Sequence, residues 1–315
     1  MLSLILLSYY SNDRIVLAYQ KLSKILNKEQ IPFELIIIDD GSKDNSYEIA
    51  LTLEKNNSNV KAFQLSKNYS SHYAIFAGLS VCEGLCAMPI PDDEQQPYET
   101  IIKMYRLWQN GKKVIIPYRV NRDDGLLTNL FANIFYKTIN LLSEIKFPKG
   151  GADTFFIDRE VIDVLRKKIH PINTSSISEV LRLGYNPEFI PYQRVKGINQ
   201  KSRWSFSKKI KLFKDVFFSS SNWPIKIISY SGLTFSILSF MIGIFYIYIK
   251  LFGNKKFWGE SLPGWTSTVV IISFFSGIIL FSLGIIAEYI WRIYEEVKNR
   301  PGYIIKLKKD SLKEK

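Results

Sequence analysis

The chain has 315 residues, 47% of them hydrophobic, and its 42 Lys and Arg against 29 Asp and Glu give a net charge of +13. This length can hold one large catalytic domain or two small ones, with ample room for a buried core. Two histidines and two cysteines, Cys82 and Cys86, are present, which argues against zinc chemistry and predicts free thiols in a reducing compartment.

The first 120 residues alternate between strand and helix patterns. An apolar run at 2–10 has strand length, and "FELIIIDDGS" (33–42) is typical of a buried parallel strand that ends in two carboxylates. Helical patterns follow these runs, and further strand patterns occur in "VKAFQLS", "LCAMPIP" and "KVIIPYR". The alternation predicts an α/β fold with a doubly wound, mainly parallel sheet and helices on both faces.

Two pairs of acids follow predicted strands. Asp39 and Asp40 end one strand, and Asp92 and Asp93 lie in the loop "PIPDDEQQPYE" after another. Ligands of such sheets bind at the carboxyl ends of strands, so both pairs are candidate site residues. Because no glycine-rich phosphate motif is present, we expect a nucleotide held partly through Mg²⁺ or Mn²⁺, which prefer oxygen ligands. The alternatives are a solvated turn for the loop and a turn or capping role for Asp39 and Asp40.

Two uncharged runs lie near the C-terminus, from Ile227 to Ile249 and from Ser261 to Ala287. Each covers the roughly 20 residues that a helix needs to cross a hydrocarbon layer. A buried core helix is the alternative, but two adjacent runs favour a pair of transmembrane helices. Lys and Arg are concentrated before and after the pair, which predicts that the main domain and the tail face the cytoplasm.

These patterns divide the chain into six predicted parts. They are a cytoplasmic domain at 1–200, an amphipathic membrane-interface segment at 201–225, a transmembrane helix at 226–250, a short external loop at 251–265, a second transmembrane helix at 266–290 and a basic cytoplasmic tail at 291–315. The position of the positive charge favours anionic lipid over nucleic acid as its partner. The first residues lack the basic region and the long apolar run of a signal peptide. We therefore expect a multi-pass protein of the inner (cytoplasmic) membrane.

Five segments resemble, in order, the motifs of polyprenyl-phosphate glycosyltransferases of glycosyltransferase family 2, which include dolichol-phosphate mannose synthase and bacterial undecaprenyl-phosphate glucosyltransferases. They are "IIIDDGSKDNS", "NYSSHYAIFAG", "PDDEQQPYE", "GADTFFIDRE" and "AEYIWRIYEEVKNRPGYII". The resemblance covers nearly the whole chain. It implies a GT-A-like (Rossmann-like) fold and inverting transfer of a sugar from a nucleotide sugar to a polyprenyl phosphate such as undecaprenyl phosphate, for modification of cell-envelope glycans. It leaves a homo-oligomer open.

The resemblance also implies roles for individual residues. Nucleotide-sugar binding falls on Asp39, Asp40 and Asp92, and metal binding falls on Asp93 and Gln95, which occupy the places of the second Asp and the Gln in the family's loop pattern. Catalytic roles fall on Asp93, Arg119 and Asp153, and binding of the acceptor phosphate falls on Arg159, Lys201 and Arg203. The alternatives are a solvated strand end for Arg119 and a structural ion pair between Asp153 and Arg159.

The chain departs from the family pattern at five positions around the expected donor pocket, one of which is Leu7, where the family has Pro. Ser11 and Pro91 stand where the family has acids, His72 stands where Glu is common, and Phe155 stands where the family has Arg. We expect His72 to line the pocket or lie on the surface. The departures leave the identity of the sugar open. They also leave two other functions open. The chain could transfer sugar to a growing polysaccharide, or it could be a non-catalytic relative.

Overall fold

A computed structural model describes most of the chain. The described residues are 1–93, 96–120, 137, 140–141, 145–148, 151–152, 154–193, 223–252 and 264–308. The chain divides into two compact units, the first formed by Met1–Ser220 with Asn299–Lys315 and the second by Ser221–Lys298. Each unit is described by itself.

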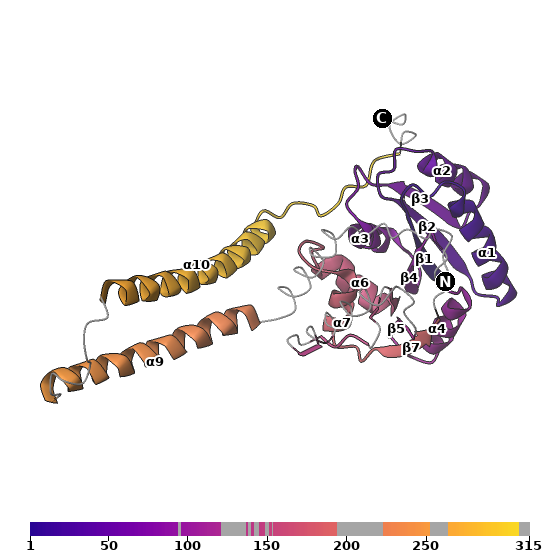
Figure 1. The fold of residues 1–315 in the computed structure, drawn as a ribbon. Coiled ribbons are helices and arrows are strands. Elements are labelled where there is room, and N and C mark those ends of the chain that lie inside the picture. Colours follow the sequence, from indigo (N-terminus) through magenta and orange to yellow (C-terminus); the bar gives the residue numbers. More distant parts are fainter. Residues whose placement is uncertain are drawn as a thin grey trace. The chain divides into compact units, whose positions relative to one another are not determined.

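The first unit is built on a seven-stranded sheet with the order β3-β2-β1-β4-β6-β5-β7 (Figure 1). Its strands are β1 (Leu2–Ser8), β2 (Phe33–Asp39), β3 (Val60–Gln64), β4 (Cys86–Pro91), β5 (Val114–Arg119), β6 (Phe156–Asp158) and β7 (Glu188–Tyr192). Paired strands run parallel, except that β6 is antiparallel to both β4 and β5. The predicted α/β class and mainly parallel sheet are confirmed.

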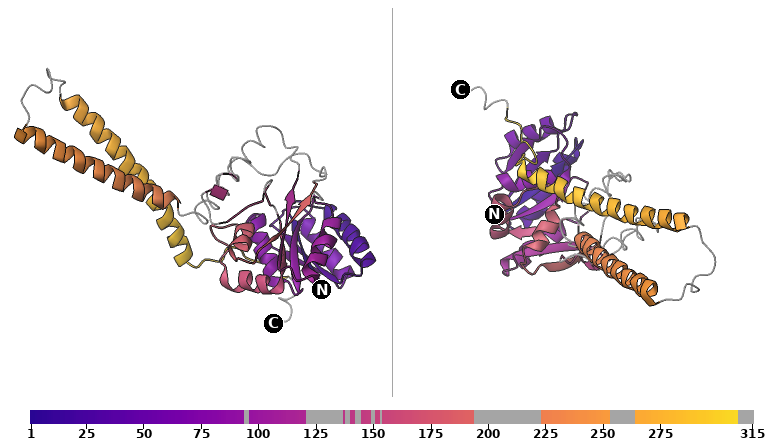
Figure 2. Two further views of the ribbon diagram at one scale, coloured as in Figure 1. Left: turned by 90° about the horizontal axis from the view of Figure 1, so that it is seen from below. Right: turned by 90° about the vertical axis from the view of Figure 1, so that its left-hand side faces the viewer.

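Helices cover both faces of this sheet (Figures 1 and 2). They are α1 (Arg14–Lys28), α2 (Ser46–Asn56), α3 (Ser71–Val81), α4 (Glu99–Gln109), α6 (Arg159–Lys168) and α7 (Ser176–Arg182). Alternate side chains of a strand point to opposite faces. Leu4 of β1 therefore belongs to the core cluster that includes residues of α1, α2 and α4, whereas the neighbouring Ile5 belongs to the cluster that includes residues of α3, α6 and α7. Gly78 lets α3 lie directly on β1, since a Cβ atom there would stand 2.3 Å from Cγ2 of Ile5.

The strand order creates a switch point between β1 and β4. From β1 the chain builds outward to β2 and β3, and it then returns to place β4 on the other side of β1. In the parallel register Ser8 lies opposite Asp39, and Leu7 lies opposite Pro91. The loops that follow β1, β2 and β4 therefore meet at one edge of the sheet, where ligands of open α/β sheets bind.

Residues 299–308, which we call the C-terminal strap, return to the first unit after the second. Ile305 forms an antiparallel bridge with Leu65, just beyond the edge strand β3. The backbone N–H of Ser66 donates to the carbonyl of Ile304 at 2.9 Å, and that of Lys306 donates to the carbonyl of Gln64 at 2.8 Å. The sequence predicted a basic tail at 291–315 and did not predict this pairing.

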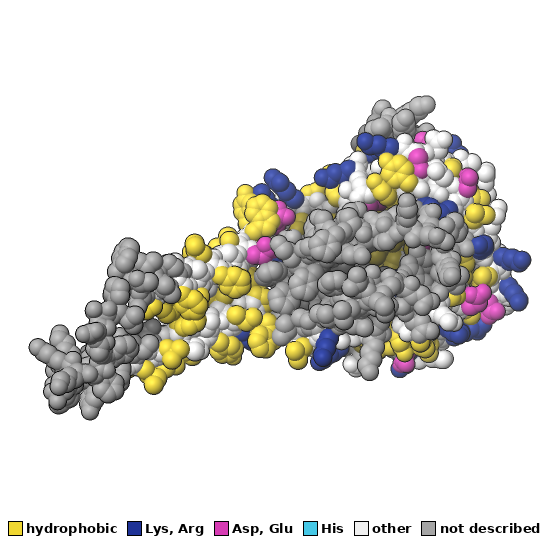
Figure 3. Space-filling view, viewed as in Figure 1, with side chains coloured by type: hydrophobic (Ala, Val, Ile, Leu, Met, Phe, Trp, Pro, Cys, Tyr) yellow, Lys and Arg dark blue, Asp and Glu magenta, His cyan; other side chains and the backbone are white. Residues whose placement is uncertain are grey.

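The second unit contains two long helices, α9 (Trp223–Phe252) and α10 (Gly264–Val297). Large apolar side chains are exposed along both, including Phe240 at 71% and Leu280 at 69% (Figure 3). Within the described residues, one segment, Phe274–Val297, is long and apolar enough to cross a membrane, with a mean hydropathy of 1.8. The second predicted transmembrane helix (266–290) overlaps this segment, and the pair of spans stays a prediction.

Candidate active site

Asp39 and Asp40 form a tightly bonded turn at the end of β2. Asp39 is fully buried, and its Oδ1 accepts a hydrogen bond from the Ser42 hydroxyl. Its Oδ2 accepts from the Ser42 backbone N–H at 3.0 Å and from the amide of Gln64 at 2.9 Å. Gly41 has φ +69°, and a Cβ atom there would lie 2.4 Å from the backbone carbon of Lys67. Glycine is therefore required between the acid pair and Ser42.

Asp40 holds the loop that leads into α3. Its Oδ1 accepts from the backbone N–H of Tyr69 at 2.7 Å, and its Oδ2 accepts from that of Ser70 at 2.9 Å. Ser70 precedes the first turn of α3 and has φ +88°. A carboxylate near a helix N-terminus is electrostatically favourable, and these bonds also hold the strained backbone at Ser70. Asp40 is 5% exposed, so both acids of the pair mainly shape the surrounding backbone.

Asp92 lies at the switch point, just after β4, and it bonds to residues that follow β1. Its Oδ2 accepts from the Ser11 hydroxyl at 2.5 Å, from Nη2 of Arg14 at 2.6 Å and from Nε of Arg14 at 3.0 Å. Asp92 is 5% exposed and Ser11 is 2% exposed. The backbone N–H of Ser11 also donates to the hydroxyl of Ser46 at 2.8 Å. This cluster ties the loop after β1 to the loops after β2 and β4.

Sequence reasoning missed Arg14. It is the first residue of α1, where a positive charge opposes the helix dipole. The sequence signal for Arg14 was a basic residue at the start of a predicted helix, because a charge in that unfavourable position needs a negatively charged partner. Asp92 is that partner, and it compensates the guanidinium inside a nearly buried cluster.

Tyr9 stands beside this cluster. Its ring meets that of Tyr10 edge to face, with 4.6 Å between the ring centroids. Burial raises the pKa of the Tyr9 phenol, and Tyr10 and the negative charge of Asp40 raise this pKa further. Tyr9 therefore stays a neutral phenol at physiological pH, able to donate a hydrogen bond at the edge of the sheet.

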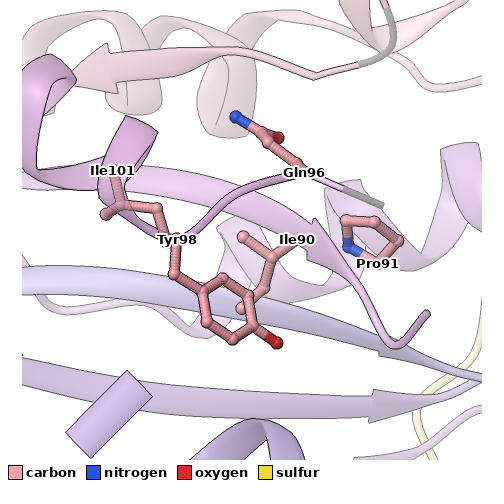
Figure 4. Close-up of a pocket in the computed structure, with 5 residues that line it drawn as sticks. All are labelled: Ile90, Pro91, Gln96, Tyr98 and Ile101. Atoms are coloured by element: carbon pink, nitrogen blue, oxygen red, sulfur yellow. The ribbon is translucent and has the colours of Figure 1, made fainter. Parts of the chain in front are cut away.

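The loop after β4 places its first residues in different surroundings. Pro91, where the family has an acid, lines a small pocket with Ile90, Gln96, Tyr98 and Ile101 (Figure 4). Asp93 follows Asp92, whereas Gln95 lies outside the described residues. Among the described residues, no group of three or more His, Cys, Asp or Glu side chains is placed to hold a metal ion.

Comparisons with known proteins identify the family of the chain. Residues 9–166 match the family described as glycosyl transferase family 2. The chain is 31% identical to the uncharacterized glycosyltransferase YkcC of Bacillus subtilis, over 93% of this chain and 90% of that protein. It is also 31% identical to the SfII prophage-derived bactoprenol glucosyl transferase of Shigella flexneri, over 97% of each chain. The chain belongs to glycosyl transferase family 2. The predicted family is thus confirmed.

In this family 2 glycosyltransferase, Arg119 lies at the same edge of the sheet as the acids. It ends β5, and its Nε donates to the hydroxyl of Tyr192 on β7 at 3.2 Å. One strand, β6, separates β5 from β4, which places the two strands roughly 10 Å apart. The location agrees with a site role for Arg119, and the role itself stays a prediction.

Arg159 does not lie with the acids. Its Nη1 donates to the carbonyls of Cys82 at 3.0 Å and Gly84 at 3.3 Å, and its Nη2 contacts Asp163 at 3.1 Å. These contacts are at the amino end of β4, about 20 Å along the six-residue strand from Asp92. The structure therefore gives no support to its predicted contact with the acceptor phosphate. Three other predicted site residues, Asp153, Lys201 and Arg203, lie outside the described residues.

Two departures from the family pattern have structural roles. His72 joins α3 to the segment before α7, because its Nδ1 accepts from the backbone N–H of Ser176 and its Nε2 donates to the carbonyl of Pro171, each at 2.8 Å. This bonding pattern requires a neutral ring. Phe155 is 1% exposed and packs in the core. Neither belongs to the acid cluster.

Both cysteines are buried free thiols, as predicted. Burial raises the pKa of Cys82 to about 11 and that of Cys86 to about 12. Because the thiolate is the nucleophilic form, neither residue is suited to catalysis at neutral pH. Both serve as small core residues.

Proposed function

We propose that this glycosyltransferase moves a sugar from a nucleotide-sugar donor to a membrane polyprenyl phosphate. The observation that carries the proposal is a switch point lined by acids on a chain that continues into two long apolar helices. A relative that is similar over 97% of each chain is named bactoprenol glucosyl transferase. Undecaprenyl phosphate is therefore the first candidate acceptor, and glucose is the first candidate sugar.

Asp39, Asp40 and Asp92 would form the nucleotide side of the site. The first two hold the backbone at Ser42 and Ser70, which would shape the pocket for the base and the ribose. Asp92 would act with Arg14, whose Nε and Nη2 are the guanidinium nitrogens engaged within the described residues. Its Nη1 would then donate to a diphosphate oxygen, a group that guanidinium recognises well.

Asp93 and Gln95 would hold a divalent cation, Mg²⁺ or Mn²⁺. Asp92 is paired with Arg14, and the side chain of Pro91 has no ligand atom. Asp93 follows them in the same loop and has a carboxylate that suits the role. Mg²⁺ is commonly held by one or two carboxylates together with substrate phosphates, and this donor set suits that mode. The cation would neutralise charge on the departing diphosphate.

The reaction would be a displacement with inversion at the anomeric carbon. An oxygen of the lipid phosphate would form the new bond to that carbon while the bond to the diphosphate breaks, and the nucleoside diphosphate would leave. The lipid phosphate is already anionic at neutral pH, so the protein would supply alignment and compensating charge. Arg119 and Asp153 are the further candidates near the reaction, and Lys201 and Arg203 are the candidates for the acceptor phosphate.

The second unit would place this chemistry at the membrane. We propose that 226–250 and 266–290 cross the inner membrane as a helical pair, with 201–225 at the interface and the first unit in the cytoplasm. The exposed apolar side chains of α9 and α10 support this arrangement. The Lys and Arg that bracket the pair support the orientation.

The test is a transfer assay with purified protein in detergent, undecaprenyl phosphate, Mg²⁺ and a panel of UDP-, GDP- and TDP-sugars. We expect mass spectrometry to detect a hexosyl-phosphate lipid, formed from UDP-glucose in the first instance. Asp93→Ala should abolish transfer without loss of folding, whereas the matched carboxylate variant Asp163→Ala, on α6, should remain active. Absence of an extractable lipid product from folded protein would favour a polysaccharide acceptor, and absence of nucleotide binding would favour a non-catalytic relative.

A further inference from the structure

The C-terminal strap contacts the first unit through side chains as well as backbone. Nζ of Lys306 donates to Oε1 of Gln64 at 2.9 Å, and Nζ of Lys308 pairs with the carboxylate of Glu54 on α2, with a closest distance of 2.5 Å. The hydroxyl of Tyr303 donates to the carbonyl of Phe76 on α3 at 3.3 Å. Of these contacts, the one made by Lys306 leads toward the site.

Gln64 connects Lys306 to Asp39. While its Oε1 accepts from Lys306, its Nε2 donates to Oδ2 of Asp39 at 2.9 Å. A lysine ammonium has donors and no acceptor, and a carboxylate only accepts, so Lys306 and Asp39 favour the same orientation of the amide and Lys306 holds its oxygen end. The reversed amide would place one oxygen against another beside a fully buried carboxylate, an unfavourable arrangement.

The same series of bonds continues to the switch point. Asp39 accepts from the hydroxyl of Ser42, and that hydroxyl accepts from the backbone N–H of Tyr10 at 2.9 Å. Tyr10 precedes Ser11, which donates to Asp92. A continuous set of hydrogen bonds thus runs from the strap, past the end of β3, to the loops after β2 and β1.

We propose that Lys306 is a positioning residue for the nucleotide site, acting through Gln64 on the turn that Asp39 holds. The inference rests on the proposed function, because it assumes that this turn forms part of the donor pocket. Lys306 itself touches no substrate in this arrangement. Its loss would loosen the pocket before the donor binds, and would leave the alignment of the reacting groups unchanged once the donor is bound.

Lys308 provides a matched control within the same strap. Like Lys306, it is a lysine that bonds to the first unit through its ammonium group, but its partner Glu54 lies on α2. Glu54 also accepts from the backbone N–H of Ala62 on β3 at 3.2 Å, and its hydrogen bonds within the described residues do not include Asp39, Asp40 or Asp92. The backbone bonds at Ile304 and Lys306 hold the strap in either variant. A general effect of strap docking would therefore appear in both variants, and an effect of positioning in Lys306 alone.

The experiment measures donor KM and kcat for the full-length protein, and UDP affinity by calorimetry in the absence of lipid. We expect Lys306→Met to raise donor KM and weaken UDP binding about threefold to tenfold, the effect of one hydrogen bond, with kcat nearly unchanged. Lys306→Arg should restore most of the affinity, and Lys308→Met should resemble the wild type. In a Gln64→Leu background, Lys306→Met should add no further loss, since coupled residues are not additive.

The outcomes separate this inference from the proposed function. Equal donor KM and UDP affinity in Lys306→Met and Lys308→Met, with an active wild type, would overturn the positioning role alone. Additive losses in the double variant would overturn the route through Gln64. If the wild type bound UDP without making a lipid product, transfer to the lipid would be excluded, and the affinities would still decide the role of Lys306. A folded wild type that binds no nucleotide would overturn both.

Discussion

At the residue scale, Ser11 shows how a departure from the family pattern fits its surroundings. An acid at this position would face Asp92, whose carboxylate is 5% exposed and lies 2.5 Å from the Ser11 hydroxyl. Two carboxylates at that distance repel, so that one of them would have to take up a proton. Serine instead donates a hydrogen bond, and Arg14 supplies the compensating charge. The departure therefore changes the bonding of Asp92 and keeps the site polar.

Restoring an acid at this position should destabilise the protein. We expect Ser11→Glu to unfold at a lower temperature than Ser11→Gln, which adds nearly the same volume without the charge. The difference should correspond to about 1–3 kcal/mol in the free energy of unfolding, the usual cost of an unsatisfied buried polar group. It should shrink as the pH falls and the introduced glutamate becomes protonated. Thermal melting at pH 5 and pH 8 measures both effects. Equal stability of the two variants at pH 8 would contradict the repulsion.

Sequence patterns located the acids because parallel strands place their carboxyl ends together, but they did not reveal the partners of those acids. Asp39, Asp40 and Asp92 do lie at the predicted edge. Their partners Gln64, Tyr69 and Arg14 come from other elements, and no local pattern specifies such contacts. The position of Arg159 was missed for the same reason, since its contacts at the amino end of β4 depend on the antiparallel insertion of β6.

At the element scale, the alternation of strands and helices was predictable because buried strands and amphipathic helices have different periods. β2 is buried at every residue, as expected of a strand with helices over both faces. The short strand β6, of three residues, was not predicted, because so brief a run carries no period. The close approach of α3 to β1 at Gly78 also depends on tertiary packing.

Packing at Gly78 gives a direct test of this helix–sheet contact. Gly78→Ala should destabilise the protein by about 1–3 kcal/mol, because the new methyl group meets a branched, fully buried side chain, and overpacking has that cost. The double variant Ile5→Ala with Gly78→Ala should recover part of this loss by making room. Denaturant unfolding of the single variants and the double variant gives the comparison. A stabilising Gly78→Ala would show that α3 does not rest on β1.

At the scale of the whole molecule, the proposed membrane arrangement makes a prediction about accessibility. A membrane-impermeant maleimide should label Lys256→Cys, in the predicted external loop, in intact cells. Lys298→Cys, on the cytoplasmic side of the second predicted helix, should be labelled only after lysis. The native cysteines provide a quiet background because burial holds both pKa values at about 11 or above. Labelling of both positions in intact cells, or of Lys298→Cys alone, would contradict the orientation.

The C-terminal strap also has a consequence for the order in which the chain is completed. The strap follows both long helices in the sequence, so it is synthesised after them. The bridge between Leu65 and Ile305 therefore forms only after α9 and α10 have left the ribosome. In a chain whose helices enter a membrane during translation, the contact from Lys306 to Gln64 would be made only by molecules that have already been delivered to their bilayer.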